Sequence, residues 1–572
     1  GRCGKCRVTV HDPASAGERH ADEERWLGDD PSLRLACRCA PSADVTVTVD
    51  ASVKPPVAAD TLAKGGGIEL ATFGAPAVTA EVVSLEAPTL HDQRSLHRRI
   101  AERVGDGDGG SSEVEVAPRV LERASALFWG TDYPVSLTVV LEWHEKRRRV
   151  LDVRPDAQTD LLGLAVDVGT TTVAAYLVDL ADHEIVASHS AANIQGSHGA
   201  DVISRIHASS NGAPLARMIR SQIEQITAEL CRTSGVDSRE VISATVVGNT
   251  TMMHLLLGLD PGPISRAPFT PVSTELISVP AGELGWPLHA EACVRILPGV
   301  SGYVGADIVA DLLACELHPE AEAALLIDIG TNGEIVLRHG QEITCCSTAA
   351  GPAFEGASIR HGLGGVAGAI NHVSREAGAL RVETIGGAPA GGICGTGLMD
   401  AVALFREDGL LDETGRLDFA ALDSEAAPAY EGRLVELDSE PAVVLGGDEP
   451  VVLTQADIRQ VQLAKAAIAA GVETLLRETE TSLDALSGVF LAGGFGTYVR
   501  PQSALRIGLL PRVDAGRVIS IGNAAGAGAA RTLVDRESLA EAVTLAGRCR
   551  YLELSGSAVF QSAFVDQMMF PE

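Results

Sequence analysis

Two short segments of the 572-residue chain place an aspartate, a glycine and hydroxyl side chains between apolar runs. They are Asp167-Val168-Gly169-Thr170-Thr171-Thr172 and Asp328-Ile329-Gly330-Thr331-Asn332-Gly333. Each is expected to be a hairpin turn in which glycine lets the backbone approach an anion, and N–H groups and hydroxyls bind it. An aspartate ending a buried strand needs a cation or a donor, and hydrated metal beside phosphate is a natural partner. The repeat predicts two related half-domains facing each other across a nucleotide, the alternative being two unrelated hairpins.

Further glycine signals follow in the second half of the chain. Gly493 and Gly494 end the apolar run 488–492, and the segment 392–397, with Gly395 and Gly397, opens a helix that is a second candidate for phosphate contact. No G-x-x-x-x-G-K-[ST] segment is present, so a P-loop does not hold the phosphates. The sequence therefore favours phosphate binding by hairpin turns.

In this order, the three segments resemble the actin, sugar-kinase and heat-shock-chaperone (ASKHA) ATPase superfamily. The resemblance implies an α/β core of duplicated, RNase H-like lobes, with two phosphate loops that hold ATP and an adenosine motif at Gly493 and Gly494. It also implies a polar-x-x-Lys pair for nucleotide ribose or phosphate on the helix expected over 454–476, where Gln462 and Lys465 lie one turn apart. The alternative for Lys465 is a lysine whose stem packs while its amine reaches solvent.

Four cysteines near the start of the chain have the spacing of a metal site. C-x-x-C at Cys3 and Cys6, then Cys37 and an alternating strand over 44–49, resemble a plant-type [2Fe-2S] ferredoxin of β-grasp fold. The resemblance implies three of the four cluster ligands here. The first ligand is expected before Gly1, in a domain that is truncated at its start. The alternatives are a zinc site that adds Cys39, or no metal.

Composition narrows the class of protein. The formal net charge of −31 argues against a nucleic-acid or anionic-membrane partner. No apolar run is long enough to span a bilayer and no signal peptide is visible, so we expect a cytoplasmic protein. Eleven cysteines in a chain of this length are too sparse for a secreted disulfide scaffold. They favour metal binding or burial.

The chain divides into four expected regions, an α/β multidomain arrangement. We expect a truncated ferredoxin-like domain over 1–71 and a linker over 72–105, because prolines and polar residues interrupt any period there. A small middle domain over 106–159 is expected to contain a helix and two strands. The ATPase core is expected over 160–572, with crossing helices opening near Asp307 and Asn523.

Several longer stretches together resemble the reductive activators of corrinoid proteins, among them VGNTTMMHLLLGLDP from Val247, AAGPAFEGA from Ala349 and FLAGGFGTYV from Phe490. The resemblance implies ATP-dependent return of cobalt(II) to cobalt(I) with one electron from the [2Fe-2S] cluster. Asp167 and Asp328 would hold Mg²⁺ and its waters. For one electron, each ~59 mV of deficit costs about 1.4 kcal/mol, which ATP would have to supply.

The implied partners are a corrinoid protein, a low-potential electron donor and a second copy of the chain in a homodimer. Two other functions remain open. One is a small-molecule kinase of the same superfamily, which would need a general base near the terminal phosphate and leaves the cysteines unexplained. The other is an ATP-gated binding module with a structural metal domain.

Overall fold

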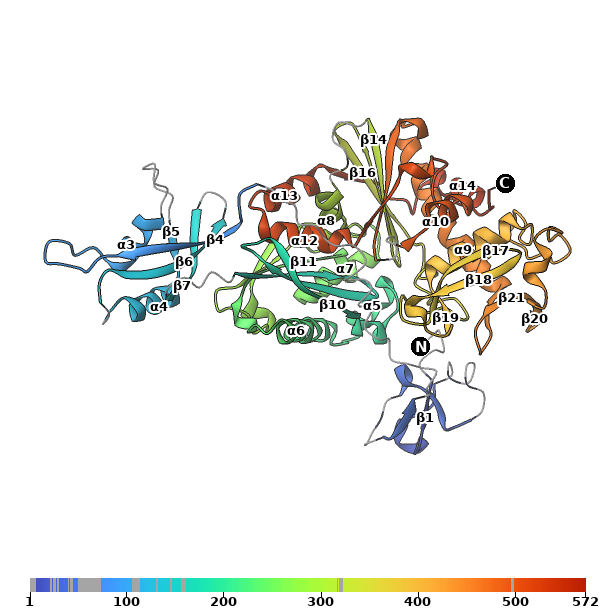
Figure 1. The fold of residues 1–572 in the computed structure, drawn as a ribbon, viewed down its shortest axis with the longest axis horizontal. Coiled ribbons are helices and arrows are strands. Elements are labelled where there is room, and N and C mark those ends of the chain that lie inside the picture. Colours follow the sequence, from blue (N-terminus) through green and yellow to red (C-terminus); the bar gives the residue numbers. More distant parts are fainter. Residues whose placement is uncertain are drawn as a thin grey trace.

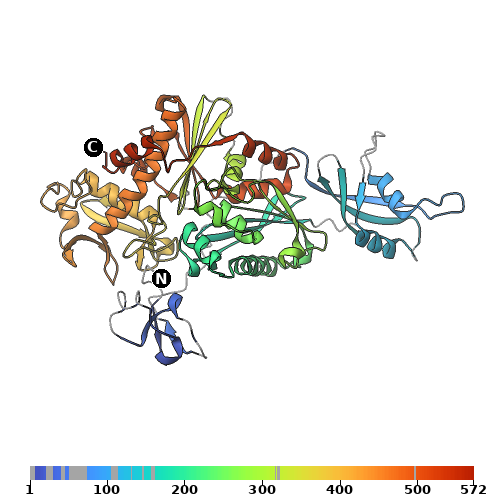
Figure 2. The ribbon, with the colours of Figure 1, turned by 180° about the vertical axis from the view of Figure 1, so that it is seen from behind.

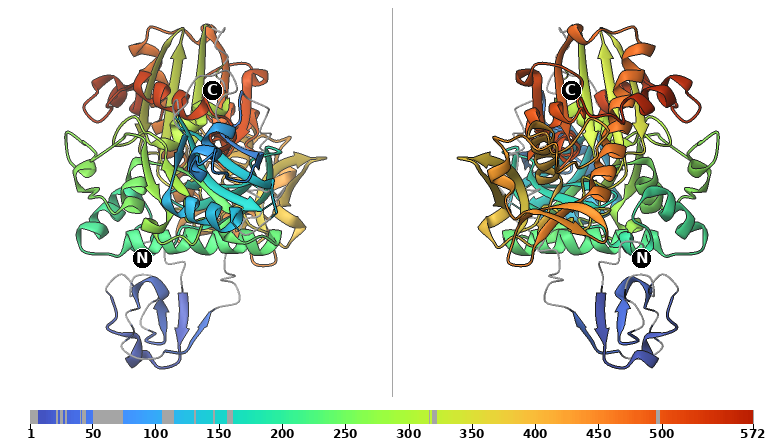
Figure 3. Two further views of the ribbon diagram at one scale, coloured as in Figure 1. Left: turned by 90° about the vertical axis from the view of Figure 1, so that its left-hand side faces the viewer. Right: turned by 90° about the vertical axis from the view of Figure 1, so that its right-hand side faces the viewer.

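A computed structural model gives the arrangement of the chain (Figure 1). It describes residues 7–20, 23, 27, 30–39, 41, 45–49, 74–104, 114–129, 132–144, 147–155, 161–315, 317, 322–494 and 498–571. Two lobes make up most of the molecule. A four-stranded domain lies beside the first lobe, and a three-stranded N-terminal sheet lies below both (Figures 1 and 3).

The first lobe is built on a six-stranded sheet of order β10-β9-β8-β11-β13-β12. Strands β8 and β9 form the first Asp-Gly-Thr hairpin, and β11 pairs with β8 in parallel. The strands are β8 (Leu162–Val168), β9 (Thr172–Asp179), β10 (Glu184–Ala192), β11 (Val241–Gly248), β12 (Ile277–Pro280) and β13 (Cys293–Ile296). The helices are α5 (Val202–Ser210), α6 (Leu215–Ser234) and α7 (Thr250–Leu257).

The second lobe repeats this plan, with order β24-β23-β14-β15-β16-β25. Its hairpin β14–β15 carries the second Asp-Gly-Thr turn, and β23 pairs with β14 in parallel, as β11 does with β8. The strands are β14 (Ala323–Ile329), β15 (Gly333–His339), β16 (Glu342–Thr348), β23 (Leu486–Ala492), β24 (Val518–Gly522) and β25 (Cys549–Tyr551). The expectation of duplicated α/β lobes is confirmed.

A subdomain is inserted into the second lobe between β16 and α10 (Gln455–Glu478), and α11 (Pro501–Arg506) and α14 (Ala558–Asp566) complete the lobe. Thr454 and Asp457 form a capping box at the start of α10, which satisfies two N–H groups at that helix end. The inserted elements are β17 (Ala369–Glu376), β18 (Ala379–Thr384), β19 (Gly392–Ile393), α9 (Gly395–Glu407), β20 (Leu434–Leu437), β21 (Glu440–Gly446) and β22 (Val451–Thr454).

Helices α8 (Ala306–Cys315) and α12 (Ala524–Val534) cross between the two lobes, at the positions expected from the sequence. They approach closely because α12 presents glycine to the backbone of α8. A Cβ on Gly528 would lie 2.6 Å from the carbonyl carbon and 2.7 Å from the Cα of Ala310. Helix α13 (Ser538–Arg548) follows α12 and also packs on α8.

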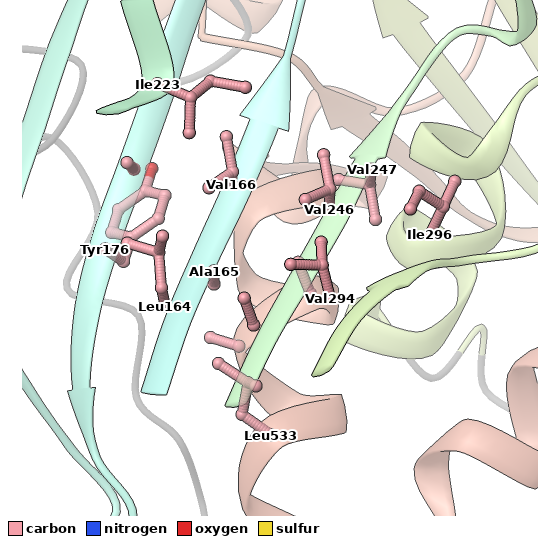
Figure 4. Close-up of a cluster of buried hydrophobic side chains, with 14 of the residues drawn as sticks. Leu164, Ala165, Val166, Tyr176, Ile223, Val246, Val247, Val294, Ile296 and Leu533 are labelled. Carbon is pink, nitrogen blue, oxygen red and sulfur yellow. The ribbon is translucent and has the colours of Figure 1, made fainter. Parts of the chain in front are cut away.

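The core of the first lobe covers both faces of its sheet (Figure 4). Leu164 and Val166 of β8 are fully buried, as is Val246 of β11. Ile223 of α6 and Leu533 of α12 belong to the same cluster, so a surface helix and a crossing helix share one core. Continuous apolar strands of this kind are typical of sheets that are covered on both faces.

The middle domain has a four-stranded sheet of order β4-β6-β7-β5 with helices α3 and α4 (Figure 2). Its elements are β4 (Val78–Leu85), α3 (Leu96–Val104), β5 (Val114–Val116), α4 (Pro118–Phe128), β6 (Val135–His144) and β7 (Arg147–Pro155). We expected residues 72–105 to form a linker, but 78–85 pair with β6 along their whole length. The buried Val83 and Leu85 explain the difference, because they complete the domain core.

The N-terminal sheet consists of β1 (Arg7–Val10), β2 (Leu33–Leu35) and β3 (Val47–Val49), in the order β2-β1-β3 (Figure 3). Arg34 and Glu23 form a buried ion pair with an Nε–Oε1 distance of 2.9 Å. Cys3 and Cys6 lie outside the described residues, and Cys37 falls in a short 3-10 helix over Ala36–Arg38. Among the helices described along the chain, none combines the length and apolar character needed to cross a membrane.

Candidate nucleotide site

A cavity of about 490 Å³ lies between the two lobes. Both Asp-Gly-Thr turns line it, together with the first residues of α12 and of α9. The two turns, 160 residues apart in the chain, come within hydrogen-bond distance, because Thr171 Oγ1 lies 3.2 Å from Thr331 Oγ1. The predicted phosphate-binding segments therefore face the same space.

The first turn is held open toward the cavity by amides from neighbouring elements. Asn249, at the start of α7, donates from Nδ2 to Thr170 Oγ1 at 3.0 Å, and Asn193 donates to the Gly169 carbonyl at 2.8 Å. A Cβ on Gly169 would lie 2.7 Å from the carbonyl oxygen of Thr172, so only glycine fits the turn. These contacts fix the backbone while Thr171 and Thr172 line the cavity.

Arg205 of α5 also contacts the first turn. No role was predicted for it from the sequence. Its side chain is 1% exposed, and it donates to the carbonyl oxygens of Thr170 and Gly199. Burial lowers the pKa of its guanidinium to about 10. The arginine places a positive charge behind a predicted phosphate loop, although nothing in its local sequence separates it from a surface arginine of an amphipathic helix.

The second turn packs against the glycine pair that ends β23. Gly493 has a φ of +89°, and a Cβ there would lie 2.5 Å from Asp328 Oδ1. A side chain at this position would therefore displace the aspartate, besides meeting backbone strain in the left-handed region. The turn itself closes with a hydrogen bond from Gly330 N to Asn332 O at 2.9 Å. Gly494 also lines the cavity.

Glu355 joins the two turns. Its Oε2 accepts hydrogen bonds from Thr171 Oγ1 at 2.9 Å and from Thr331 Oγ1 at 2.7 Å. The first of these donors belongs to the first lobe, and the second belongs to the second lobe. Burial raises the pKa of the Glu355 carboxyl, although both hydroxyl donors and Arg205 favour its charged form. Glu355 lay in a glycine-rich stretch to which the sequence assigned no role.

Five further carboxyl groups line the cavity, and the pKa of each of them is raised. Burial, followed by the nearby Asp307, raises the pKa of Asp167 to about 7, and burial raises that of Asp307 to about 6. The pKa values of Asp328, Asp311 and Glu334 are also raised, first by burial and then by neighbouring carboxylates. Such a concentration of carboxylates is unfavourable unless protons or a bound cation neutralise part of the charge.

Asp311 has the least compensation among these carboxyl groups. It is 1% exposed, and neither carboxylate oxygen has a hydrogen-bond partner within the described chain. Asp307 and Asp311 are four residues apart, so they share one face of α8. The i, i+4 spacing of these two aspartates is visible in the sequence, and it is the local signal by which the pair could have been predicted.

Three other predicted glycines have different surroundings. Gly395 lines the cavity at the start of α9. Gly397 is packed, since a Cβ there would lie 2.9 Å from the carbonyl carbon of Ile370. Gly333 is also packed, since a Cβ would lie 2.7 Å from Ile468 Cγ1. Close packing alone accounts for glycine at both of these positions.

Gln462 and Lys465 are not brought to the cavity. Gln462 donates from Nε2 to the carbonyl oxygens of Thr414 at 3.0 Å and Met568 at 2.9 Å. Lys465, fully buried, donates to the Met569 carbonyl, and its Nζ lies 5.1 Å from the centre of the Phe570 ring. The C-terminal segment therefore covers the pair that we expected to contact nucleotide, which could not be foreseen because the contact spans about a hundred residues.

Within the described part of the chain, no group of three or more His, Cys, Asp or Glu side chains is arranged as a preformed metal site. Cys39 is half-buried. The predicted cluster ligands Cys3 and Cys6 are outside the described residues, so the choice between an iron–sulfur and a zinc site stays a prediction. A metal beside Asp167 or Asp328 would have to bring its own waters or phosphate oxygens.

Comparisons with known proteins agree with this geometry. Residues 162–320 match a family model described as the RACo middle region, and 322–572 match one described as the C-terminal ASKHA domain of RACo. The corrinoid activation enzyme RamQ of Eubacterium limosum is 33% identical over 435 residues, which cover 74% of this chain and 73% of RamQ.

Two further matches point the same way. A Methanosarcina barkeri reductase for a Co(II) methylated-amine-specific corrinoid protein is 26% identical over 316 residues, covering 51% of this chain and 54% of the reductase. A solved structure of a reductive activator for a corrinoid, iron-sulfur protein is 33% identical and superposes with a TM-score of 0.79. That match covers 100% of this chain and 92% of the other.

Proposed function

This chain belongs to the RACo family of reductive activators, and from that premise we propose that it catalyses the ATP-dependent reduction of a corrinoid protein from Co(II) to Co(I). One observation carries the proposal. The two turns with their threonine hydroxyls and a cluster of carboxyl side chains all line the same cavity between the lobes. The family relation favours this activity over a small-molecule kinase or an ATP-gated binding module.

The cavity is the proposed ATP site. Backbone N–H groups of the two turns, with the hydroxyls of Thr170, Thr171, Thr172 and Thr331, are the proposed phosphate donors. Asn332 and the Gly493–Gly494 pair complete the site on the side of the second lobe. The orphaned carboxylate of Asp311, near Asp307, supports entry of a cation with the phosphates. Asp167 and Asp328 are the proposed holders of Mg²⁺ and its waters.

The N-terminal segment is proposed to hold a [2Fe-2S] cluster through Cys3, Cys6 and Cys37. Support comes from their spacing and from the antiparallel pairing of β1 with β2 and β3, because β1 directly follows Cys6 in the sequence and β2 ends two residues before Cys37. Such a cluster supplies one electron at low potential. The protein's part is to hold the cluster and to dock the corrinoid partner.

The remaining parts of the proposal follow from this activity. A low-potential donor must re-reduce the cluster. Reduced cobalamin chemistry and free thiols fit a cytoplasmic setting. A homodimer is expected.

The test is an anaerobic assay with a Co(II) corrinoid protein, a reductant and the activator. Formation of Co(I), followed by its absorption, should require both ATP and the activator. Cys3→Ser together with Cys6→Ser should abolish Co(I) formation and leave nucleotide affinity unchanged, because the cysteines are distant from the cavity in sequence and domain. Equal rates with and without ATP, over a range of reductant potentials, would contradict the proposed coupling.

A further inference from the structure

Glu355 has a place in the cavity that neither the family relation nor the proposed phosphate loops explain. Its Oε2 accepts hydrogen bonds from Thr171 Oγ1 at 2.9 Å and from Thr331 Oγ1 at 2.7 Å. A threonine hydroxyl has one proton to donate. While Glu355 accepts from both hydroxyls, neither can donate to a phosphate oxygen.

A carboxylate oxygen and a phosphate oxygen can each accept hydrogen bonds from these two hydroxyls. Each is an anionic acceptor that forms a short, charge-assisted hydrogen bond. The two hydroxyls are 3.2 Å apart and come from the two lobes, so one oxygen between them satisfies both. We infer that the Glu355 carboxylate occupies, in the nucleotide-free protein, the place of a phosphate oxygen, and that nucleotide binds by displacing it.

This inference rests on the proposed ATP site. It implies that displacing Glu355 offsets part of the binding free energy of the nucleotide. The incoming phosphate must break the two hydrogen bonds to Glu355, and it also approaches a half-buried carboxylate. Displacement frees Thr171 from its bond across the lobes. The contact between Glu355 and the first lobe is then replaced by contacts that the nucleotide makes to both lobes.

The experiment measures the affinity of the full chain for adenosine, ADP and a non-hydrolysable ATP analogue, by calorimetry in the presence of Mg²⁺. Glu355→Gln removes the charge while keeping the shape of the side chain. We expect five- to tenfold tighter binding of the phosphorylated ligands and unchanged binding of adenosine. Glu376→Gln is the matched control, since Glu376 is an exposed glutamate at the end of β17 in the same lobe.

A second variant tests whether the competition is for these hydroxyls. In a Thr331→Val background one of the disputed donors is absent, so the gain from Glu355→Gln should shrink by at least half. This is a double-mutant cycle, in which two groups that share a partner give non-additive effects. A gain of unchanged size would show that charge repulsion, and not hydrogen-bond competition, explains the result, and would overturn the inference.

The outcomes separate the inference from the proposed function. Weaker or unchanged binding of phosphorylated ligands by Glu355→Gln overturns the inference alone, as does an equal gain for adenosine. Failure of the wild-type chain to bind any of the three ligands overturns the proposed ATP site itself. If Glu355→Gln does not fold, Glu355→Asp replaces it, because the shorter side chain cannot bridge both hydroxyls.

Discussion

Replacing Gly528 by alanine tests how tightly the two crossing helices are packed. The new Cβ would lie 2.6 Å from the carbonyl carbon of Ala310 and 2.7 Å from its Cα, whereas ordinary contacts begin near 3.4 Å. The obstructing atoms belong to the backbone of α8, so no side chain can rotate away. Relief requires that α8 and α12 separate by close to an ångström.

Two opposing effects determine the expected change in the free energy of unfolding. Overpacking of this kind costs about 3 kcal/mol, at the upper end of the usual range, because backbone must move. Alanine recovers about 1 kcal/mol of helix propensity relative to glycine. The net loss is about 2 kcal/mol, which corresponds to a fall of roughly 4 °C in melting temperature for a large domain. Nucleotide turnover should fall as well, since α8 carries Asp307 and Asp311.

Thermal unfolding followed by calorimetry measures the effect, with Gly547→Ala as the matched control. Gly547 is also helical, in α13, but no atom lies within 4 Å of a Cβ built on it. That substitution should leave the melting temperature unchanged or raise it slightly. A Gly528→Ala protein that melts with or above the wild type, beside a well-behaved control, would refute the packing argument.

Three other substitutions have defined outcomes. Gly493→Ala should weaken ATP binding at least tenfold, measured by calorimetry, since its Cβ would lie 2.5 Å from Asp328 Oδ1; wild-type affinity would contradict this. Asp167→Asn should lower ATP turnover by about a hundredfold while the protein still melts cooperatively; retained turnover would remove Asp167 from the site. Burial lowers the pKa of Lys465 to about 8 from 10.5, so the folded protein binds fewer protons than the unfolded chain between these values and stability rises with pH there. Lys465→Met should remove about 3 kcal/mol of this rise, seen by urea unfolding at pH 7.5 and 10.5, and an unchanged slope would contradict it.

Local patterns predicted the parts of the fold that local forces determine. The two hairpin turns, the helix that starts at Thr454 and both crossing helices follow from short segments, and the structure contains each of them. The strand at 78–85 was missed because prolines on both sides resembled a linker. Its alternating apolar residues gain their stability only when β6 lies beside them.

Contacts between distant segments could not be predicted in the same way. Glu355 meets Thr171 across 184 positions of sequence, and Lys465 meets Met569 across 104. Neither glutamate nor lysine has a local pattern that distinguishes a buried, partnered side chain from an exposed one. Asp307 and Asp311 of α8 are partly predictable. Their i, i+4 spacing is visible in the sequence, but their role depends on the cavity that they line, which only the fold creates.

Helix α12 also connects the cavity to the middle domain. Its first turn borders the cavity, through Asn523 and Ala525, and its last residue, Val534, accepts a backbone hydrogen bond from Ala77 at 3.2 Å. The middle domain is thus attached to the far end of a rod roughly 16 Å long. Over this length, a tilt of about 5° about the nucleotide end would displace the attachment by roughly 1.4 Å. One helix therefore connects the cavity directly to the domain that follows the cysteine-bearing segment.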